Sequence, residues 1–144
     1  MRRVCWLIIL IPLLVACGDV GSVHTSEEAG CAAPYLDDQP PGRGQDKPPP
    51  TVRPGATVEV YGHWYTSTCN DTGGNDPLKP LPDVELTLTL PGGESRSLGR
   101  HRPGGPDMGF KAVVRIPADT RSGTATIKAD GSYPAEFRFK VVRP

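Results

Sequence analysis

The cysteine at position 17 has the most informative chemistry in this chain, because of what precedes it. Arg2 and Arg3 give a basic start, an apolar stretch runs from Val4 to Ala16, and Cys17 follows directly. A basic start, an apolar stretch and a small residue before the cut are the parts of a secretory signal peptide. The stretch is too short to span a membrane comfortably. We therefore expect cleavage before Cys17, which would place its thiol at the start of the mature chain.

The four residues Leu14, Val15, Ala16 and Cys17 resemble the lipobox of bacterial lipoproteins. In that family the cysteine sulfur receives a diacylglycerol and becomes the first residue of the mature protein. The resemblance implies a signal peptide over residues 1–16, lipidation (palmitate-type acyl chains) at Cys17, and a position at the cell membrane on its extracytoplasmic face. Acyl chains anchor a protein because each buried methylene contributes roughly 0.8 kcal/mol. A plain secretory signal and an uncleaved anchor are the alternatives.

Two further cysteines stand in the expected mature domain. Cys5 leaves with the signal peptide and Cys17 takes the lipid, so Cys31 and Cys69 remain as a pair in an oxidising compartment. We predict that they form a disulfide. Closing a loop of this length would stabilise the fold by roughly 4 kcal/mol on the chain-entropy model.

Metal chemistry finds little support in the spacing of the potential ligands. Three histidines (His24, His63 and His101) could join Cys31 and Cys69 around zinc, but the sequence has no Cys-x-x-Cys and no His-x-x-x-His pair. The segment Asn70–Asp76 gathers oxygen ligands and glycines that calcium would accept, yet it lacks the register of an EF-hand. The same residues are typical of a long hairpin loop. We expect no metal and no cofactor, with the calcium alternative open.

Catalysis would need a nucleophile, a base and an orienting group. Ser67, His63 and Asp71 fall close together in the sequence, but no Gly-x-Ser-x-Gly elbow and no phosphate-binding loop is present. We expect that the protein is not an enzyme.

An aromatic stripe is the best candidate for a binding surface. Tyr61, His63 and Tyr65 alternate along one expected strand, with Trp64 on the opposite face. Aromatic rings on an exposed sheet can bind an envelope protein or a glycan through flat contact with hydrogen-bonding ends. The alternative is that the N-terminal segment or the disulfide covers them.

Composition indicates the fold class that must position these residues. Seventeen glycines and seventeen prolines among 144 residues are too many for a helical protein and stand between short apolar alternations, which predicts an all-β chain. Without Arg2 and Arg3 there are 14 basic and 16 acidic residues, a net charge of −2, which argues against a nucleic-acid partner. The arginine, proline and glycine content resembles that of actinobacterial proteins.

Period-2 alternation predicts five strands, near residues 56–64, 84–90, 110–116, 124–129 and 136–141. A weak edge strand in 95–102 and an early strand near Tyr35 and Leu36, or near Val52, bring the total to about seven. Because one face of every strand is apolar, two sheets packed face to face would satisfy them all. The small, polar residues after Cys17 predict a flexible tether over 17–30, and the proline-rich stretch 34–54 is expected to wrap the domain.

The runs Asp107–Ala129 and Arg53–Gly62 resemble bacterial immunoglobulin-like domains of secreted and surface proteins. The resemblance covers about residues 50–143 and implies a β-sandwich, to which we assign residues 31–144 as one domain; such domains mostly serve as spacers or binding modules. We therefore expect a membrane-anchored extracytoplasmic lipoprotein that acts as a non-catalytic interaction or structural module of the cell envelope. The alternative is a ligand- or metal-binding accessory lipoprotein that serves a transporter or an envelope enzyme.

Overall fold

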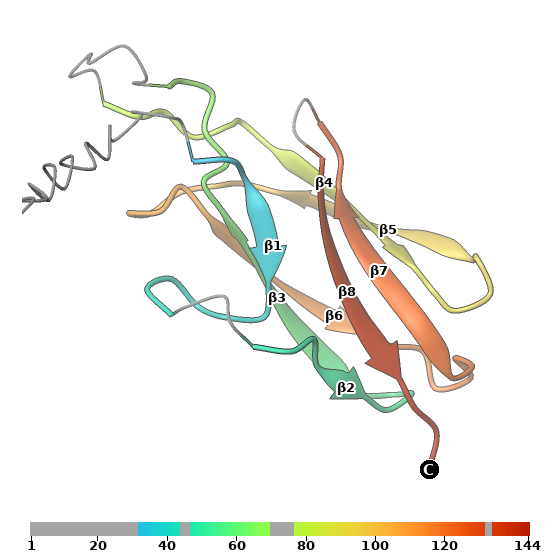
Figure 1. Ribbon diagram of the computed structural model, residues 1–144. Helices are drawn as coiled ribbons and strands as arrows, with labels where there is room; N and C mark the ends of the chain where they lie inside the picture. Colours follow the sequence, from blue (N-terminus) through green and yellow to red (C-terminus); the bar gives the residue numbers. More distant parts are fainter. Residues whose placement is uncertain (1–31, 44–46, 70–76, 132–133) are drawn as a thin grey trace, which may run out of the picture.

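The computed structural model describes residues 32–43, 47–69, 77–131 and 134–144. Within these ranges the chain is all-β, and it forms eight strands (Figure 1). In chain order they are β1 (Tyr35–Asp37), β2 (Thr51–Val52), β3 (Thr57–His63), β4 (Val84–Thr89), β5 (Ser95–His101), β6 (Phe110–Arg115), β7 (Gly123–Ala129) and β8 (Ala135–Val141). In the described ranges, none of the chain forms a helix of the length and apolarity needed to cross a membrane.

The strands form two sheets that pack face to face, so the predicted immunoglobulin-like β-sandwich is confirmed (Figure 1). One sheet has three strands in the order β1-β3-β6, and the other has five in the order β2-β8-β7-β4-β5. Every pairing is antiparallel except that of β2 with β8. The constant-type immunoglobulin order places four strands against three. Here β5 pairs with β4 and enlarges the second sheet instead.

The core consists of the alternate residues of the long strands, as the sequence pattern predicts. In β8 every second side chain is buried, and β3, β4, β6 and β7 follow the same rule over most of their length. Fully burying an aliphatic or aromatic side chain contributes roughly 1.5–3 kcal/mol. The largest side chains that are almost completely buried are Tyr65, Phe139, Leu86, Leu88, Ile116, Ile127, Val60, Val84 and Val141.

The weak edge strand predicted in 95–102 is present as β5. Most of its residues are exposed, since it lies at the border of the five-stranded sheet. Its pairing with β4 shifts register between Leu86 and Thr87, and on the β5 side Gly99 has a φ of +84°. A bulge of this kind twists an edge strand and makes it a poorer template for another chain.

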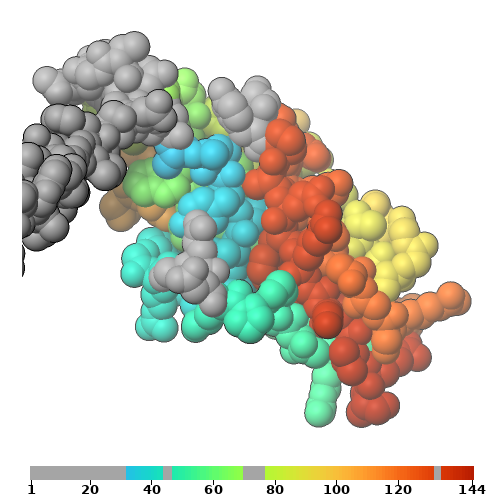
Figure 2. Space-filling model, viewed as in Figure 1, coloured from blue at the N-terminus to red at the C-terminus, as the bar shows by residue number. Residues whose placement is uncertain are grey.

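Both early segments form short strands, which explains why there are eight strands rather than about seven. β1 belongs to the three-stranded sheet and β2 to the five-stranded sheet, so the proline-rich link between them crosses from one sheet to the other. The link ends in a bond from the Lys140 N–H to the Pro50 carbonyl, at 3.1 Å. Figure 2 shows β1 (light blue) beside β8 (red) on one face of the molecule.

Candidate functional site

The C-terminal end of β3 departs from regular strand geometry. Trp64 has a φ of +60°, and Met108, in the loop before β6, has a φ of +48°. The two segments hold each other: the Trp64 N–H donates to the Asp107 carbonyl at 2.8 Å, and the Tyr65 N–H donates to the Met108 carbonyl at 3.1 Å. Left-handed backbone at a non-glycine residue costs free energy and persists only where the surroundings impose it. The chain therefore turns after β3, and the strand alternation stops at His63.

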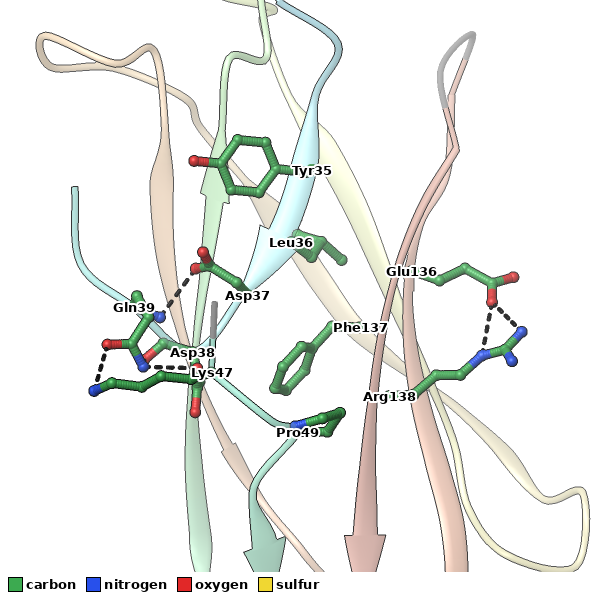
Figure 3. Close-up of a pocket in the computed structure, with 10 residues that line it drawn as sticks. All are labelled: Tyr35, Leu36, Asp37, Asp38, Gln39, Lys47, Pro49, Glu136, Phe137 and Arg138. Carbon is green, nitrogen blue, oxygen red and sulfur yellow. Dashed lines mark hydrogen bonds and ion pairs between the residues drawn. The ribbon is translucent and has the colours of Figure 1, made fainter. Parts of the chain in front are cut away.

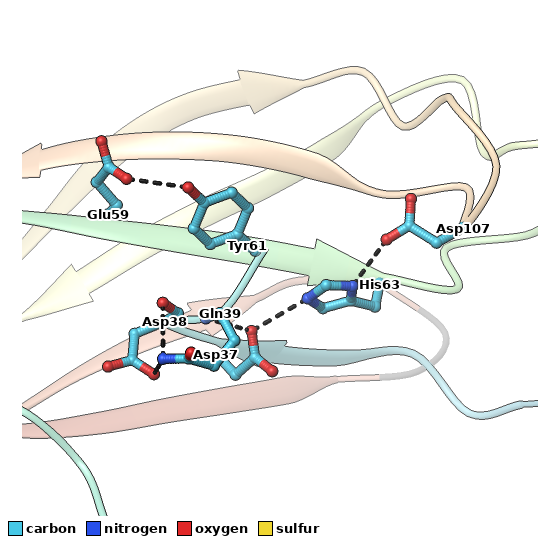
Figure 4. Close-up of polar contacts among 7 residues, drawn as sticks. All are labelled: Asp37, Asp38, Gln39, Glu59, Tyr61, His63 and Asp107. Atoms are coloured by element: carbon cyan, nitrogen blue, oxygen red, sulfur yellow. Dashed lines mark hydrogen bonds and ion pairs between the residues drawn. The ribbon is translucent and has the colours of Figure 1, made fainter. Parts of the chain in front are cut away.

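His63 lies between two carboxylates at this point (Figure 4). Its Nδ1 atom is 2.7 Å from Oδ2 of Asp107, and its Nε2 atom is 3.0 Å from Oδ1 of Asp37. Asp37 comes from β1, His63 from β3 and Asp107 from the loop before β6, so the three residues connect distant parts of the chain. We refer to Asp37, His63 and Asp107 as the carboxylate–histidine cluster.

The histidine of the cluster is closed to solvent by its neighbours. The Tyr35 ring stacks on the imidazole with centroids 4.6 Å apart and an 18° angle between the planes, and His63 is only 3% exposed. A side chain at position 109 would collide with the Gly62 carbonyl and crowd the Asp107 carboxylate. Glycine at 109 therefore allows the loop to approach β3 closely enough for Asp107 to reach the histidine.

The proton inventory of the cluster limits its chemistry. A neutral imidazole has one N–H donor, and carboxylates only accept, so both hydrogen bonds form together only if the cluster holds one additional proton. Each ring nitrogen of His63 has a carboxylate partner, which leaves neither available to act as a base toward a nucleophile. The Ser67 hydroxyl donates elsewhere, to the carbonyls of Lys79 and Pro80. This arrangement ties β1 to the body of the domain and does not resemble a catalytic triad.

The three residues predicted to form an aromatic stripe do not form one exposed surface. Tyr61 is half-buried on the outer face of the three-stranded sheet, where its hydroxyl donates to Glu59 and the Lys111 ammonium lies 5.5 Å from its ring centre. His63 shares that face, but β1 covers it. Tyr65 is 2% exposed and packs against Phe110 inside the sandwich.

Tyr65 is buried because the left-handed Trp64 reverses the side on which the next side chain falls. Burial raises the pKa of the Tyr65 hydroxyl, which has no hydrogen-bond partner among the described residues. The sequence alternation counted Tyr65 as outward, and the structure corrects this.

Several residues singled out from the sequence lie outside the described ranges. These are Cys17, Cys31, His24 and the loop Asn70–Asp76. Lipidation, the Cys31–Cys69 disulfide and calcium binding therefore stay predictions. His101 stacks on Phe110 with ring centres 5.4 Å apart, and the residues that the structure describes contain no group of three His, Cys, Asp or Glu side chains placed to hold a metal ion.

A groove between the two sheets is a second candidate site (Figure 3). It has a volume of about 530 Å³ and lies between β1 and β8, with the proline-rich link at one end. Leu36 and Phe137 point toward the gap between the sheets, while Asp37 and Arg138 stand on the opposite outer faces. The complete lining is Tyr35, Leu36, Asp37, Asp38, Gln39, Lys47, Pro49, Glu136, Phe137 and Arg138.

The charges of the groove are distributed unevenly. Glu136 bonds Lys128 at 2.8 Å and Arg138 at 2.8 Å, and both partners lower the pKa of its carboxyl. On the other side Asp38 accepts a bond from the Gln39 amide, and Lys47 donates to the same amide's oxygen at 3.1 Å. The β1 side therefore keeps the acidic character, because the β8 carboxylate is already matched by two cations.

The groove and the two aspartates of the cluster have no local signal in the sequence. Asp37 is the last residue of a three-residue strand, and Asp107 sits in a glycine-rich loop that predicts only a turn. The one sequence signal for Asp107 is Gly109, directly before a strand, because a glycine in such a position can mark the close approach of two backbones.

Comparison with known proteins assigns the chain to no family. No protein-family model matches the chain, and no curated protein matches it. Among solved structures, the chain is similar to part of a mutant of Salmonella alpha-2-macroglobulin, with 13% identity and a TM-score of 0.49. The match covers 81% of this chain and 6% of the much longer macroglobulin chain.

Proposed function

We propose that this protein is a lipid-anchored, extracytoplasmic module of the cell envelope that binds a partner and catalyses no reaction. The observation that carries the proposal is the contrast between the buried histidine and the open groove beside it. His63 is buried, and both of its ring nitrogens bond carboxylates. The groove, in contrast, has accessible apolar and charged groups side by side. Such a surface is suited to recognition.

The anchor rests on the sequence around Cys17. A diacylglycerol on its sulfur would be followed by about 17 residues before β1 begins. The described chain enters the sandwich at the end opposite the C-terminus (Figure 1). An anchor there would hold the domain by one end and leave the groove, which lies along the side between β1 and β8, accessible to a partner in the same membrane or near it.

The predicted disulfide would fasten the tether to the domain. Ala32 and Ala33, which follow Cys31 in the chain, line a pocket of about 210 Å³ together with Trp64 and Cys69. This neighbourhood supports the pairing of Cys31 with Cys69. The bond would join the tether to the segment after β3.

Membrane fractionation of cells that produce the full chain tests the anchor. We expect Cys17→Ser to move the protein from the membrane fraction to the soluble extracytoplasmic fraction. Cys5→Ser is the matched control, because it removes a thiol from the same apolar stretch but leaves the acyl acceptor, and it should stay with the membrane. A Cys17→Ser protein that still sediments with membranes would refute lipid anchoring at this residue.

A further inference from the structure

The outer strand of the smaller sheet, β6, has an edge that no strand covers within the described ranges. β6 pairs only with β3, which separates it from β1 (Figure 1). Alternate residues of an antiparallel strand bond to opposite sides, and the Ile116 N–H donates to the Ala56 carbonyl at 2.9 Å, so the even-numbered residues of β6 bond β3. Lys111, Val113 and Arg115 therefore direct their N–H and C=O groups away from β3, where the described part of the chain supplies no backbone partner.

A short bridge shows that this side of the strand accepts an extended chain. Gly109, directly before β6, exchanges two backbone hydrogen bonds with Gly104 of the preceding loop, at 2.7 and 2.9 Å, in an antiparallel bridge. Gly109 is odd-numbered like Lys111, so the bridge lies on the side away from β3. The pairing ends there, and among the described residues the edge from Lys111 to Arg115 stays uncovered. A segment of about five residues, roughly 17 Å long, would cover it.

The edge of β6 lacks the protection that the edge of β5 has. These two outer strands border the sandwich on the side away from the groove. β5 has a register shift and the left-handed Gly99, which twist its edge. β6 pairs with β3 in one unbroken register, contains no proline, and exposes 64% of Val113. A regular edge strand with an exposed apolar side chain is suited to strand addition by another chain.

The outer face of β6 sets the charge of the occupant. Lys111 is matched by the Glu59 carboxylate at 2.7 Å, whereas Arg115 is exposed and has no carboxylate partner among the residues that the structure describes. In an antiparallel ladder, the residue directly opposite Arg115 carries its side chain on this same outer face. An acidic residue at that position would meet an unmatched cation, and a basic residue would be repelled.

A second copy of this chain is an unsuitable occupant. Symmetric antiparallel pairing of two β6 edges about Val113 would place Lys111 of each copy opposite Arg115 of the other. Like charges directly opposite each other destabilise a ladder. The charges therefore favour a different chain.

We propose that the free edge of β6 binds an extended segment of a partner protein, which pairs antiparallel with residues 111–115 and places acidic side chains opposite Arg115 and beside Lys111. The alternate side chains of the segment face inward, toward the border of the core where Leu98 and Phe110 are only partly buried, and are apolar. This surface lies on the border of the sandwich away from the groove. The inference therefore goes beyond the proposed function and holds whether or not the groove is occupied.

A synthetic peptide, acetyl-Glu-Val-Thr-Val-Glu-amide, is the probe. Its binding to the isotope-labelled full chain, purified from membranes in detergent, is measured from the amide chemical shifts of the protein. We expect saturable changes that are largest in residues 111–115. The counterpart with lysine in place of glutamate should bind at least about tenfold more weakly because of its charge.

Methylated peptides test the strand ladder itself. Methylation of the threonine nitrogen removes an N–H that would face β6, and it should abolish binding. Methylation of the first valine nitrogen removes an N–H that would face away from β6, so it is the matched control. This second peptide should bind within about threefold of the parent.

Substitutions in the protein locate the site. Val113→Pro removes an N–H on the free edge without removing a bond to β3, and it should abolish binding, whereas Val113→Thr keeps the N–H and should bind within about threefold. Arg115→Glu should weaken the acidic peptide by about tenfold. Arg115→Gln, a smaller change that guards against misfolding, should give an intermediate affinity. Lys140→Glu makes the same charge change on the exposed face of β8 and should leave the affinity within about twofold.

The inference is overturned if the acidic peptide does not bind, if its shifts fall on another strand, if the two methylated peptides behave alike, or if Arg115→Glu and Lys140→Glu behave alike. Shifts in residues 111–115 that depend on protein concentration without peptide would assign the edge to a second copy. Slow hydrogen exchange of the odd-numbered β6 amides in the peptide-free monomer would assign it to the chain's own acidic tether, and either result also overturns the inference. Cys17→Ser should leave peptide binding unchanged, so its failure is distinguishable from failure of the membrane anchor.

Discussion

The two sheets of this sandwich reach stability by different means. The five-stranded sheet buries one apolar residue in every two along β4, β7 and β8, and its polar groups remain on the outer face. The three-stranded sheet buries fewer large side chains. At the C-terminal end of β3 it instead buries His63, whose two ring nitrogens each bond one carboxylate. The first arrangement distributes stability over many similar contacts, whereas the second depends on a few specific ones.

The difference shows where a single change should matter most. An apolar core tolerates substitutions of similar volume, because its contacts are numerous and nondirectional. A buried ionic cluster does not tolerate the loss of one member, since the remaining charges stay buried without a partner. We therefore expect the carboxylate–histidine cluster to be the most sensitive part of the smaller sheet.

The largest expected effect follows from removing the histidine. His63→Ala should lower the free energy of unfolding by about 2–4 kcal/mol, because it leaves the largely buried Asp37 and Asp107 carboxyls without their hydrogen-bond partner and removes the Tyr35 stack. Urea denaturation measures the loss. Adding Asp107→Asn to His63→Ala should recover part of it by removing one buried charge. A loss below about 1 kcal/mol would show that the cluster is not a stabilising element.

A smaller effect is expected at the glycine that admits Asp107 to the cluster. Gly109→Ala should cost about 1–3 kcal/mol, because the added Cβ would press on the Gly62 carbonyl and the Asp107 carboxylate. Gly104, which pairs with Gly109 across the same loop, has no atom near the position of an added Cβ. Gly104→Ala is thus the matched control and should be nearly neutral in the same denaturation experiment. Equal effects of the two substitutions would contradict the steric argument.

The smallest effect concerns two surface carboxylates that form ion pairs, Glu59 on the smaller sheet and Glu136 on the larger. Lys111 lowers the pKa of the Glu59 carboxyl on the smaller sheet, and Lys128 followed by Arg138 lowers that of Glu136 on the larger. A lowered folded-state pKa adds stability that is present above the ordinary value of 4.5 and is lost as the pH falls through the folded-state value. Glu136→Gln and Glu59→Gln should each reduce the fall in Tm between neutral and acid pH slightly. Variants with an unchanged pH profile would show that the pairs contribute nothing measurable.

The strands of the larger sheet were predicted well from the sequence, because the alternation that identifies a strand is a local pattern. Alternation along a strand needs only the next few residues, so β4, β7 and β8 were predictable to within a residue or two at each end, as was the exposed edge strand β5. The number of strands was slightly underestimated. β1 and β2 are so short that pairing with β3 and β8, and not their own sequence, decides that they are strands.

The candidate site was much less predictable, because its members come from separate segments. Asp37, His63 and Asp107 meet only after three parts of the chain have assembled, and no spacing in the sequence announces that. Alternation along the strand predicted that Tyr61 and His63 point outward. It left open whether they are exposed or covered by the N-terminal segment or the disulfide, and in the structure β1 of the N-terminal segment covers His63. Tyr65 was misplaced because one left-handed residue, Trp64, ended the alternation without any glycine to signal it.

The placement of β1 and β2 in different sheets has a mechanical consequence for a domain held by its N-terminus. Tension arriving along the tether would load β1 first, and β1 resists through three ladder pairs and the contacts of His63. Peeling β1 away would release residues 35–50 as slack of up to about 55 Å while β3 to β8 stay folded. A Cys31–Cys69 disulfide would transfer the tension to the segment after β3. The oxidation state of these two cysteines would therefore decide whether β1 bears the tension and whether residues 35–50 can extend.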